Sequence, residues 1–395
     1  MIIKFQVLVK NLLVNISKIL AIFIRKLPVS SEFIGPPKGL HESAKKFILN
    51  SDFEVYPAHI IHSSKPETID EIVHWKFRTN YKRQAPPLFT AIVPGGRVWG
   101  SMGAIITQDD KLLGEVSQFV GGRLSDHPAL FQVRLPSVSR LNGKVAVLST
   151  SGGEGYFHWM MQVLPRIGIL NSCKTFNEKI DYFIVNSQAL PFQKETLRYL
   201  NIPEEKLVDS NRYPHIKADQ LIVPSVPQQL PKFCVDFIRK SFLDNPLVNQ
   251  AISLKNLSSR IYISRSQASR RRITNENKLI SLLKSLNFTM LTLESMSIAE
   301  QVKLFSVAEI IVAPHGAGLT NLAFCNEGTK VIEIFSPNYI NICYYAMSNH
   351  LGLSYYYLIG EGNAPAEYVD PHQGDSDIYV DVEKLKQILK IADII

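Results

Sequence analysis

The sequence predicts a mixed α/β protein with two consecutive Rossmann-like domains that face a cleft, preceded by a β-rich segment and an N-terminal amphipathic helix. From residue 144 onward, short apolar runs alternate with longer segments of helical periodicity, and a second series of the same kind starts at residue 260. Such alternation is typical of parallel sheets that helices cover on both faces. Ligands of these sheets bind at the carboxyl ends of the strands, so the turns after the strands hold the candidate binding residues.

The first strand–helix series follows a segment, residues 51–136, that is expected to be mainly β-structure. That segment contains short apolar or alternating runs separated by turn residues. The runs lie at 89–93, 97–99, 104–107 and 112–116. The series itself is expected to contain strands at 145–148, 182–185 and 220–223 and helices at 156–170, 192–200 and 233–243.

The second series is longer and contains the clearest unit, a strand, a glycine-containing turn, a small helix and a second strand within residues 309–335. Ser297 and Glu300 have the spacing of a capping box ahead of a helix at 298–307. The expected strands are 260–264, 288–293, 309–313, 330–335 and 355–359. The expected helices are 276–286, 298–307, 319–325, 340–350 and 382–391.

These assignments divide the chain into four parts. An amphipathic helix at 1–27 is followed by a linker at 28–50 that contains proline and glycine. The β-rich segment and the first Rossmann-like domain, expected to bind the acceptor, fill 51–250, and the second Rossmann-like domain fills 255–395. A chain of 395 residues is long enough for two such cores.

The composition is that of an ordinary globular protein, with no internal repeat and no low-complexity tract. The net charge of +8 is compatible with an anionic ligand or an anionic membrane, and identifies neither. The four cysteines are scattered without the spacing of a metal site. That scatter favours reduced, buried thiols in a cytoplasmic protein.

The N-terminal segment is strongly apolar but carries one polar stripe. At 100° per residue the stripe contains Lys4, Asn11, Asn15, Lys18, Arg25 and Lys26. Such a helix is suited to lie in the interface of an anionic membrane, and Lys18 interrupts any run long enough to cross one. The alternative is a helix docked on the protein's own core. A secretory signal is less favoured, because no convincing cleavage site follows.

Two segments of the second series are suited to bind an anion. In the turn at 314–318, Gly316 and Gly318 allow close approach of a ligand, and the N-terminus of the next helix offers unpaired N–H groups, which suits a diphosphate. Arg265, Arg270 and Arg271 follow a strand end and offer forked donors to phosphate oxygens. The alternatives are a bare structural turn and a solvated basic loop. Nucleic acid is disfavoured, because no aromatic residues interleave with the arginines.

The first series contains a candidate general base. His158 lies in the first turns of a helix that follows a glycine-rich turn at 152–155. A histidine there can accept a proton, and a histidine satisfied inside the core is the alternative.

Two acidic pairs are candidate metal ligands. Asp375 and Asp377 have the Asp-x-Asp form, and Asp109 and Asp110 are adjacent in a turn. Solvated turns are favoured for both pairs. We expect no metal, and the sequence contains no zinc spacing and no nucleophile elbow.

Taken together, these segments resemble glycosyltransferase family 61, whose members are related to protein O-GlcNAc transferases and plant xylan xylosyl- and arabinosyltransferases. Bacterial members are often labelled capsular polysaccharide biosynthesis proteins. The matching segments occur in the family's order: 156–159 with 164–166, then 261–265 with 270–272 and 275–276, then 315–321 with 331–333. The resemblance covers roughly residues 90–360.

The resemblance implies a GT-B fold and an inverting, metal-independent transfer from a nucleotide-sugar, without a further cofactor. It implies that the nucleotide is bound by Arg265, Arg270, Arg271, His315, Gly316, Ala317, Gly318, Thr320, Asn321 and Glu333, with Glu333 on the ribose. His158 is the expected base and Glu154 the alternative. The chain departs from the family at Gly155, where Asn is usual, and at Gln162, where Asp is usual. A catalytic role of that Asp cannot be carried over.

The leading interpretation is a transferase that moves a sugar, from UDP in the first place, to a saccharide or glycolipid hydroxyl in cell-surface polysaccharide synthesis. It would work in the cytoplasm, or on the cytoplasmic face of a membrane. One alternative is a nucleotide-binding protein of the same fold without turnover. Another is a metal-dependent GT-A-type transferase that uses Asp375 and Asp377.

Overall fold

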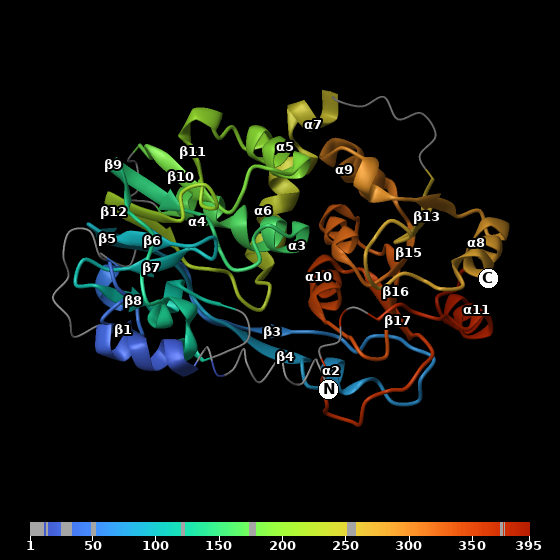
Figure 1. Cartoon of the computed structure of the whole chain (residues 1–395). Coiled ribbons are helices and arrows are strands. Elements are labelled where there is room, and N and C mark those ends of the chain that lie inside the picture. The colour runs from blue at the N-terminus through green and yellow to red at the C-terminus, as the bar shows by residue number, and fades with distance from the viewer. Residues whose placement is uncertain are drawn as a thin grey trace. The chain divides into compact units, whose positions relative to one another are not determined.

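The computed structural model describes residues 12, 15–24, 34–48, 53–119, 123–173, 179–250, 258–371, 374 and 376–395 (Figure 1). The chain forms two compact units. The first contains Met1–Ala58 and Pro86–Pro227, and the second contains His59–Ala85 and Gln228–Ile395. The chain thus passes between the units after Ala58, Ala85 and Pro227, and the second unit includes an early segment that the sequence analysis places in the first domain.

The first unit is built on one mixed sheet of ten strands, in the order β1-β8-β7-β6-β12-β9-β10-β11, with β5 on β12 and β2 on β5. The β-rich segment and the first strand–helix series thus share one sheet. Its strands are β1 (Gly39–His41), β2 (Glu54–Tyr56), β5 (Leu88–Pro94), β6 (Arg97–Trp99), β7 (Ala104–Ile106), β8 (Lys111–Leu113), β9 (Ser139–Val147), β10 (Tyr182–Val185), β11 (Leu207–Asp209) and β12 (His215–Pro224).

Only part of this sheet has the parallel character expected of a Rossmann-like domain. Strands β12, β9, β10 and β11 are parallel to one another, whereas β5 and β6 run antiparallel to β12. The apolar runs 145–147 and 221–223 are fully buried, as expected for strands covered on both faces. The carboxyl ends of β9 and β12 lie at the same edge, and buried polar residues follow both strands, namely Ser149, Thr150 and Ser225.

The helix expected at 156–170 is three consecutive segments. They are α3 (Tyr156–His158), a π-helical turn η6 (Trp159–Val163) and α4 (Pro165–Ser172). Pro165 has no N–H and its ring crowds the preceding turn, so regular α-helical bonding cannot continue through it. The chain relaxes this conflict with a wider turn, in which the N–H of Leu164 donates to the carbonyl of Trp159 at 2.9 Å. Turns of this type occur often at functional sites.

Arg166 locks α4 to the sheet. Its side chain is fully buried, Nε donates to the Pro224 carbonyl at 3.0 Å, and Nη1 donates to the Ser149 carbonyl at 2.8 Å. Burial lowers the pKa of Arg166 to about 9, so the guanidinium remains charged at neutral pH. The arginine therefore ties together the chain segments that leave β9 and β12. α5 (Pro191–Tyr199) follows β10 as expected.

The second unit contains a five-stranded, fully parallel sheet in the order β14-β13-β15-β16-β17. The strands are β13 (Arg260–Ile263), β14 (Thr289–Leu291), β15 (Ile310–Pro314), β16 (Lys330–Phe335) and β17 (Ser354–Ile359). From β13 the chain first moves outward to β14 and then returns past β13 to β15. The order therefore reverses between β13 and β15, and in open parallel sheets this reversal is where ligands bind.

Helices cover both faces of this sheet. α8 (Glu276–Ser285) and α11 (Val382–Ile391) share a hydrophobic core with Tyr262, Val312 and Ile332. α9 (Ile298–Val307), the 3₁₀ helix η9 (Ala317–Phe324), α10 (Cys343–Leu351) and α6 (Lys232–Leu243) pack against one another on the opposite face. This arrangement is what right-handed crossovers require when the direction of travel reverses.

Several local predictions for this unit are confirmed. Strand 330–335 and helices 298–307 and 382–391 have the expected bounds. The capping box is also present, because the N–H of Glu300 donates to Ser297 Oγ at 3.2 Å and the N–H of Ser297 donates to Glu300 Oε2 at 2.7 Å. The small helix expected at 319–325 is the 3₁₀ helix η9, which starts two residues earlier.

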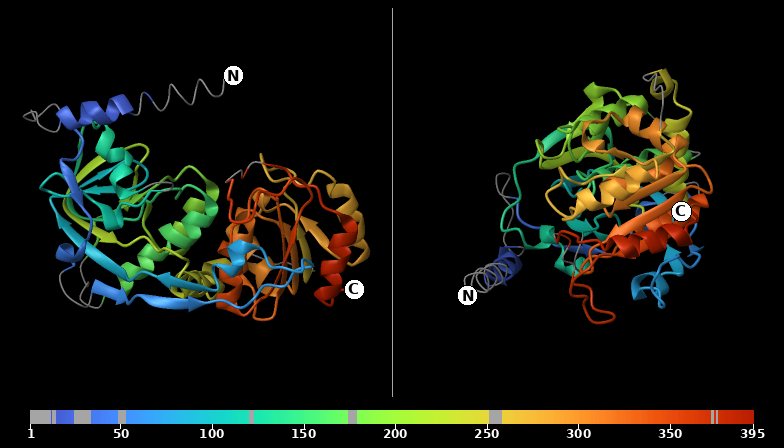
Figure 2. Two further views of the ribbon diagram at one scale, coloured as in Figure 1. Left: turned by 90° about the horizontal axis from the view of Figure 1, so that it is seen from below. Right: turned by 90° about the vertical axis from the view of Figure 1, so that its right-hand side faces the viewer.

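An early segment of the chain completes the edge of the second sheet. It contains the hairpin β3 (His59–His62) and β4 (Lys82–Ala85) with the short helix α2 (Trp75–Arg78), and Figure 2 shows it in light blue beside orange and red elements. Glu67 exchanges main-chain bonds with β17, and Phe77 stacks on Tyr357 with ring centroids 4.5 Å apart. Covering β17 in this way removes an exposed strand edge.

The described part of the N-terminal helix, residue 12 and residues 15–24, presents apolar side chains to solvent. Those exposed are Leu12, Ile16, Ile19, Leu20, Ile22 and Phe23. Lys18 instead turns inward, with Nζ 3.4 Å from Asp126 and over the ring of Phe131. Lys4, Asn11, Arg25 and Lys26 of the expected polar stripe lie outside the described residues. Within the described residues, no helix combines the length and apolarity needed to cross a bilayer.

Two buried histidines give the first unit a defined response to acid. Burial lowers the pKa of His127 and of His215 to about 4 in each case. His215 donates from Nδ1 to the Pro136 carbonyl at 2.8 Å, and its other nitrogen faces the Arg97 guanidinium. Both imidazoles are therefore neutral in the folded protein at pH 7.

We predict that the free energy of unfolding is lost as the pH falls from about 6.5 to about 4. In this range the unfolded state binds protons that the folded state rejects, at up to about 1.4 kcal/mol per pH unit for each histidine. Urea unfolding followed by tryptophan fluorescence at pH 7, 6 and 5 measures the slope. A His215→Gln variant should have a shallower slope than the wild type, and an unchanged slope would refute the assignment.

Candidate functional site

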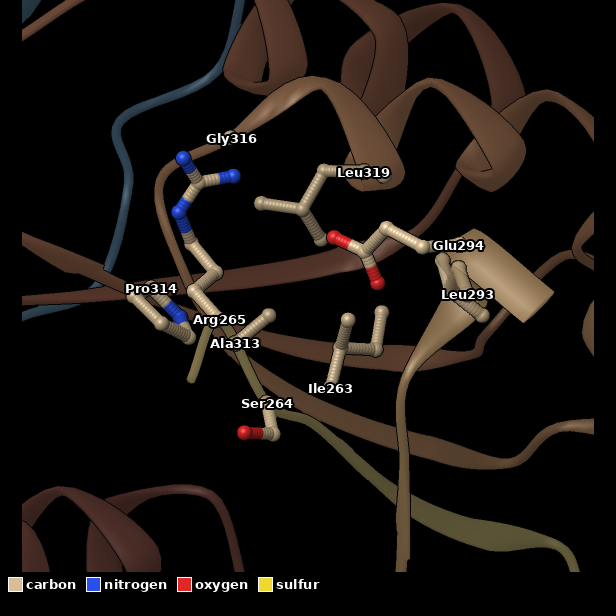
Figure 3. Close-up of a pocket in the computed structure, with 10 residues that line it drawn as sticks. Ile263, Ser264, Arg265, Leu293, Glu294, Ala313, Pro314, Gly316 and Leu319 are labelled. Atoms are coloured by element: carbon tan, nitrogen blue, oxygen red, sulfur yellow. The ribbon is translucent and has the colours of Figure 1, made fainter. Parts of the chain in front are cut away.

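A small hollow lies at the point where the strand order of the second unit reverses (Figure 3). It holds about 20 Å³, enough for one water-sized group, so a larger anion would lie at its mouth. Its walls come from the ends of β13 and β15, from the turn η8 (Leu293–Ser295) and from the start of η9. The lining residues are Ile263, Ser264, Arg265, Leu293, Glu294, Ala313, Pro314, Gly316, Gly318 and Leu319.

Arg265 is the main cationic group of this hollow. Its guanidinium lies against Gly316 so closely that a Cβ there would be 2.0 Å from Nη1. The backbone of Gly316 is extended, so a side chain here would be opposed by the guanidinium, which would have to move, and not by the φ angle. Nη2 donates to the Arg270 carbonyl at 3.0 Å, whereas Nε is buried and has no partner among the described residues.

The electrostatics of Arg265 favour a bound anion. Burial lowers the pKa of this guanidinium, and the charge of Arg271 lowers it further. Glu294 partly offsets these effects from across the hollow. A partly desolvated guanidinium with an unused N–H gains more from a phosphate oxygen than a fully hydrated one.

The turn that faces Arg265 is held in place from inside the protein. Asn321 is fully buried, and its Nδ2 donates to Gln301 Oε1 at 2.6 Å and to the Gly318 carbonyl at 3.1 Å. Gln301 in turn donates to the carbonyls of Leu293 and Met296. Thr320 is also buried, 3.4 Å from the hydroxyl of Tyr344. Thr320 and Asn321 therefore shape the turn and do not line the hollow.

The same turn presents main-chain donors. Ala317 and Gly318 open η9, and the first N–H groups of a helix have no partner within it. The N–H of Leu319 is already bonded to the Gly316 carbonyl at 3.0 Å. The start of η9 therefore adds donors and a positive dipole end to the charge of Arg265.

His315 and Glu333 form a buried pair behind the turn. The carboxylate of Glu333 is fully buried and accepts from His315 Nδ1 and from the hydroxyl of Tyr355. Both of its oxygens are thus engaged inside the unit, where the resemblance implied a contact with ribose. The ring of His315 stacks on Phe335 at 5.2 Å. Because a carboxylate only accepts, Glu333 fixes the proton of His315 on Nδ1.

The other two arginines of the expected set occupy different positions. Arg271 is buried, with a φ of 55°, and braces the turn from behind by donating from Nε to the His315 carbonyl at 3.1 Å. Its Nη1 donates to the Gly374 carbonyl at 2.6 Å. Arg270 is exposed and supplies the carbonyl that Arg265 binds. Of the three, Arg265 alone lines the hollow.

The described residues of the two acidic pairs are bonded to neighbouring side chains. Asp377 accepts from the guanidinium of Arg272 at 2.7 Å, and Asp375 lies outside the described residues. Asp109 accepts from Thr107 and His41, and Asp110 pairs with Arg97. Across the described residues, no group of three or more His, Cys, Asp or Glu side chains is arranged to hold a metal ion. The four cysteines carry free thiols.

In the first unit, a glycine-rich loop after β9 surrounds His158. Asn186, at the end of β10, holds this loop through bonds to both main-chain groups of Thr150. A Cβ at Gly153 would be 2.1 Å from Asn186 Oδ1, so glycine is required at this position. Gly152 has a φ of 75°, and a Cβ there would be 3.3 Å from His158 Nε2. The loop backbone therefore reaches the imidazole closely.

His158 is half-buried, which differs from the fully buried core histidines of this unit. Its Nδ1 is 2.7 Å from Oε1 of Gln162. Glu154, the alternative base, is exposed and accepts from Asn211 Nδ2 at 2.7 Å.

Three polar residues around these sites were not predicted from the sequence: Asn186, Gln301 and Asn211. The signal for Asn186 was a polar residue directly after a buried strand, and for Gln301 a polar residue on the buried face of a helix.

A second, larger cavity of about 310 Å³ lies in the second unit. It is formed where β16 and β17 end, by residues of the early segment around α2 and of the loop after β17. Its walls are Ile72, Val73, His74, Trp75, Arg78, Pro337, Ile340, Ile359, Ala364, Pro365, Ala366 and Glu367. The sequence did not predict it, because its two sides are almost 300 residues apart in the chain.

Comparison with known families agrees with the resemblance drawn from the three segments. The model of the family described as Glycosyltransferase 61 matches residues 156–332. The matched region starts at the helix that carries His158 and ends within β16, so it includes Arg265 and the turn of Gly316. No curated protein matches the chain. Together with the parallel sheet and the cationic hollow at its reversal point, this match supports membership of the chain in glycosyltransferase family 61.

Proposed function

We propose that this glycosyltransferase transfers a sugar from a nucleoside diphosphate donor, in the first place a UDP-sugar, to a saccharide hydroxyl with inversion and without a metal. The observation that carries the donor assignment is Arg265. Its buried, unpartnered Nε lies beside the start of η9, at the reversal point of a parallel sheet. Both elements attract the same anion, which fits the diphosphate of such a donor.

The proposed reaction is a single displacement. The acceptor oxygen attacks the anomeric carbon while the bond from that carbon to the diphosphate oxygen breaks, and its electron pair leaves with the diphosphate. Negative charge on the leaving group is stabilised by Arg265 and by the first N–H groups of η9. In this mechanism the fixed cation and the helix end supply the electrostatic stabilisation that a bound metal provides in other enzymes.

The acceptor proton needs a base, and His158 fits this role better than Glu154. His158 is half-buried after the glycine-rich loop, at the carboxyl end of β9, where parallel sheets bind their ligands. Glu154 is exposed and already held by Asn211. The proposal thus assigns donor binding to the second unit and acceptor activation to the first, the division of labour in a GT-B-like enzyme.

The acceptor in this proposal is a saccharide or glycolipid of a cell-surface polysaccharide, met at the cytoplasmic face of an anionic membrane. The support is the described part of the N-terminal helix, which exposes six apolar side chains. An exposed apolar helix face of this kind is typical of helices that lie in a membrane interface.

For the donor site, we predict that Arg265→Ala weakens UDP binding about 10- to 150-fold. This corresponds to the loss of about 1.5–3 kcal/mol from a charge-assisted hydrogen bond. Titration calorimetry measures the affinity. Arg272→Ala is the matched control, because Arg272 belongs to the same loop but pairs with Asp377 outside the hollow. Equal affinities of the two variants would exclude Arg265 as a diphosphate ligand.

For the base, we predict that His158→Ala lowers turnover about 10²- to 10⁴-fold while UDP affinity stays nearly constant. Steady-state kinetics with a panel of radiolabelled nucleotide-sugars provides the measurement. Glu154→Gln is the control and should retain most of the activity. A folded His158→Ala protein with near-native turnover, together with an inactive Glu154→Gln protein, would transfer the role to Glu154.

For the membrane, we predict that the protein floats with vesicles that contain anionic lipid. The double variant Ile19→Gln, Phe23→Gln should lose most of this flotation, because about 3 kcal/mol or more of apolar burial disappears. Leu190→Gln with Leu247→Gln is the control, since these leucines are also exposed but lie elsewhere, one directly before α5 and the other in α7 (Pro246–Gln250). If both double variants float as well as the wild type, the helix is not the membrane contact.

A further inference from the structure

We infer that Gln162 is a positioning residue that fixes the neutral tautomer of His158, so that Nε2 is the nitrogen free to accept the acceptor proton. The inference rests on the proposed role of His158 as the base. It concerns one of the two positions at which the chain departs from the pattern of the family that it resembles. The geometry of two hydrogen bonds carries it.

The first bond fixes the orientation of the Gln162 amide. Its Nε2 lies 3.2 Å from the main-chain carbonyl of Pro227. A carbonyl oxygen can only accept a hydrogen bond, so the NH₂ group of the amide must face Pro227. The opposite orientation would place two oxygens against each other. The other end of the amide, Oε1, is therefore directed away from Pro227 and toward the imidazole.

The second bond transfers this orientation to the histidine. Oε1 of Gln162 lies 2.7 Å from Nδ1 of His158. An amide oxygen accepts and cannot donate, so Nδ1 must carry the proton. In a neutral imidazole the remaining nitrogen is then unprotonated. Nε2 thus has a free lone pair, and the Gly152 backbone lies close to it, since a Cβ there would be 3.3 Å from Nε2.

The backbone around this pair is arranged to bring the two side chains together. His158 ends α3, and Gln162 lies four residues later in the π-helical turn. Residues four apart on a helix lie on one face. The wide turn caused by Pro165 thus begins directly after the base and contains its orienting partner, and Pro227 is supplied by the segment that leaves β12.

A neutral amide differs from a carboxylate at this position. Both accept from Nδ1–H and select the same tautomer. The amide does so without adding a negative charge beside the imidazole. Gln162 therefore retains the orienting function of an acceptor while leaving out the electrostatic attraction for the protonated ring.

The tautomer is measured directly by long-range ¹H–¹⁵N NMR of histidine-labelled full-length protein. The His158 signals are identified by their absence in His158→Asn. We expect the wild type to show the Nδ1–H form and Gln162→Leu to shift toward the Nε2–H form. Gln162→Glu loses the bond to the Pro227 carbonyl but still accepts from Nδ1, so it should keep the Nδ1–H form. A wild-type protein with the proton on Nε2 would overturn the inference, whichever residue is the base.

Kinetics then test whether the tautomer matters for turnover. We expect Gln162→Leu to lower kcat about 10- to 10⁴-fold. The upper limit is the loss found when a catalytic histidine takes the wrong tautomer. KM for the donor should not change, and Gln162→Glu should recover much of the rate. Unchanged kcat in Gln162→Leu with a shifted tautomer would refute the positioning role. Near-native turnover of His158→Ala would instead refute the proposed function and leave the tautomer result intact.

Discussion

The contact between the Arg265 guanidinium and the backbone of Gly316 is the constraint around which the second unit is organised. The two residues are 51 positions apart in the printed sequence, and they meet because β13 and β15 are neighbours in the sheet. A side chain at residue 316 would displace the guanidinium. Arg271, Asn321 and Gln301 hold the two sides of this contact through main-chain carbonyls. The result is a cation with an unused N–H beside a helix end.

In the first unit, buried polar side chains likewise hold the loop that follows a strand end. Arg166 and Asn186 are buried, and both bond to main-chain groups of the segment that follows β9. Buried polar side chains with satisfied bonds define one geometry of a loop more sharply than apolar packing does. In both units, the residues that fix the loop are thus distinct from the residues proposed to act on the substrates. The latter, Arg265 and His158, each keep a nitrogen without a partner among the described residues.

The parts that could be predicted from sequence are those set by local patterns. The strand at 330–335 is an apolar run between turns, and the helix at 298–307 carries its own capping box, so neighbouring residues contain the whole signal. The break in the helix after His158 was missed, although Pro165 was visible. Whether proline kinks, ends or widens a helix depends on which carbonyls find other donors, and that is a property of the folded chain.

Some site residues could be predicted from local sequence patterns, and others could not. Arg265 and Gly316 could be predicted, because strand ends and glycine turns are visible in the sequence. The surroundings of Glu333 could not, since its partners His315 and Tyr355 come from the strands on either side. Period-two alternation places Glu333 on the same face as Val331 and Phe335. It does not say whether that face offers hydrogen-bond partners or water.

The early segment that covers β17 also constrains how the chain is made. The chain passes between the units at three places, after Ala58, Ala85 and Pro227, so the first unit interrupts the second. During synthesis, residues 59–85 leave the ribosome before most of the first unit and long before β17, the strand that they cover. They remain without this partner strand until β17 has been made. A fragment that begins at residue 255 would lack this cover and expose β17 to strand-mediated aggregation. Folding of the second unit is therefore a late event that depends on two segments far apart in the polypeptide.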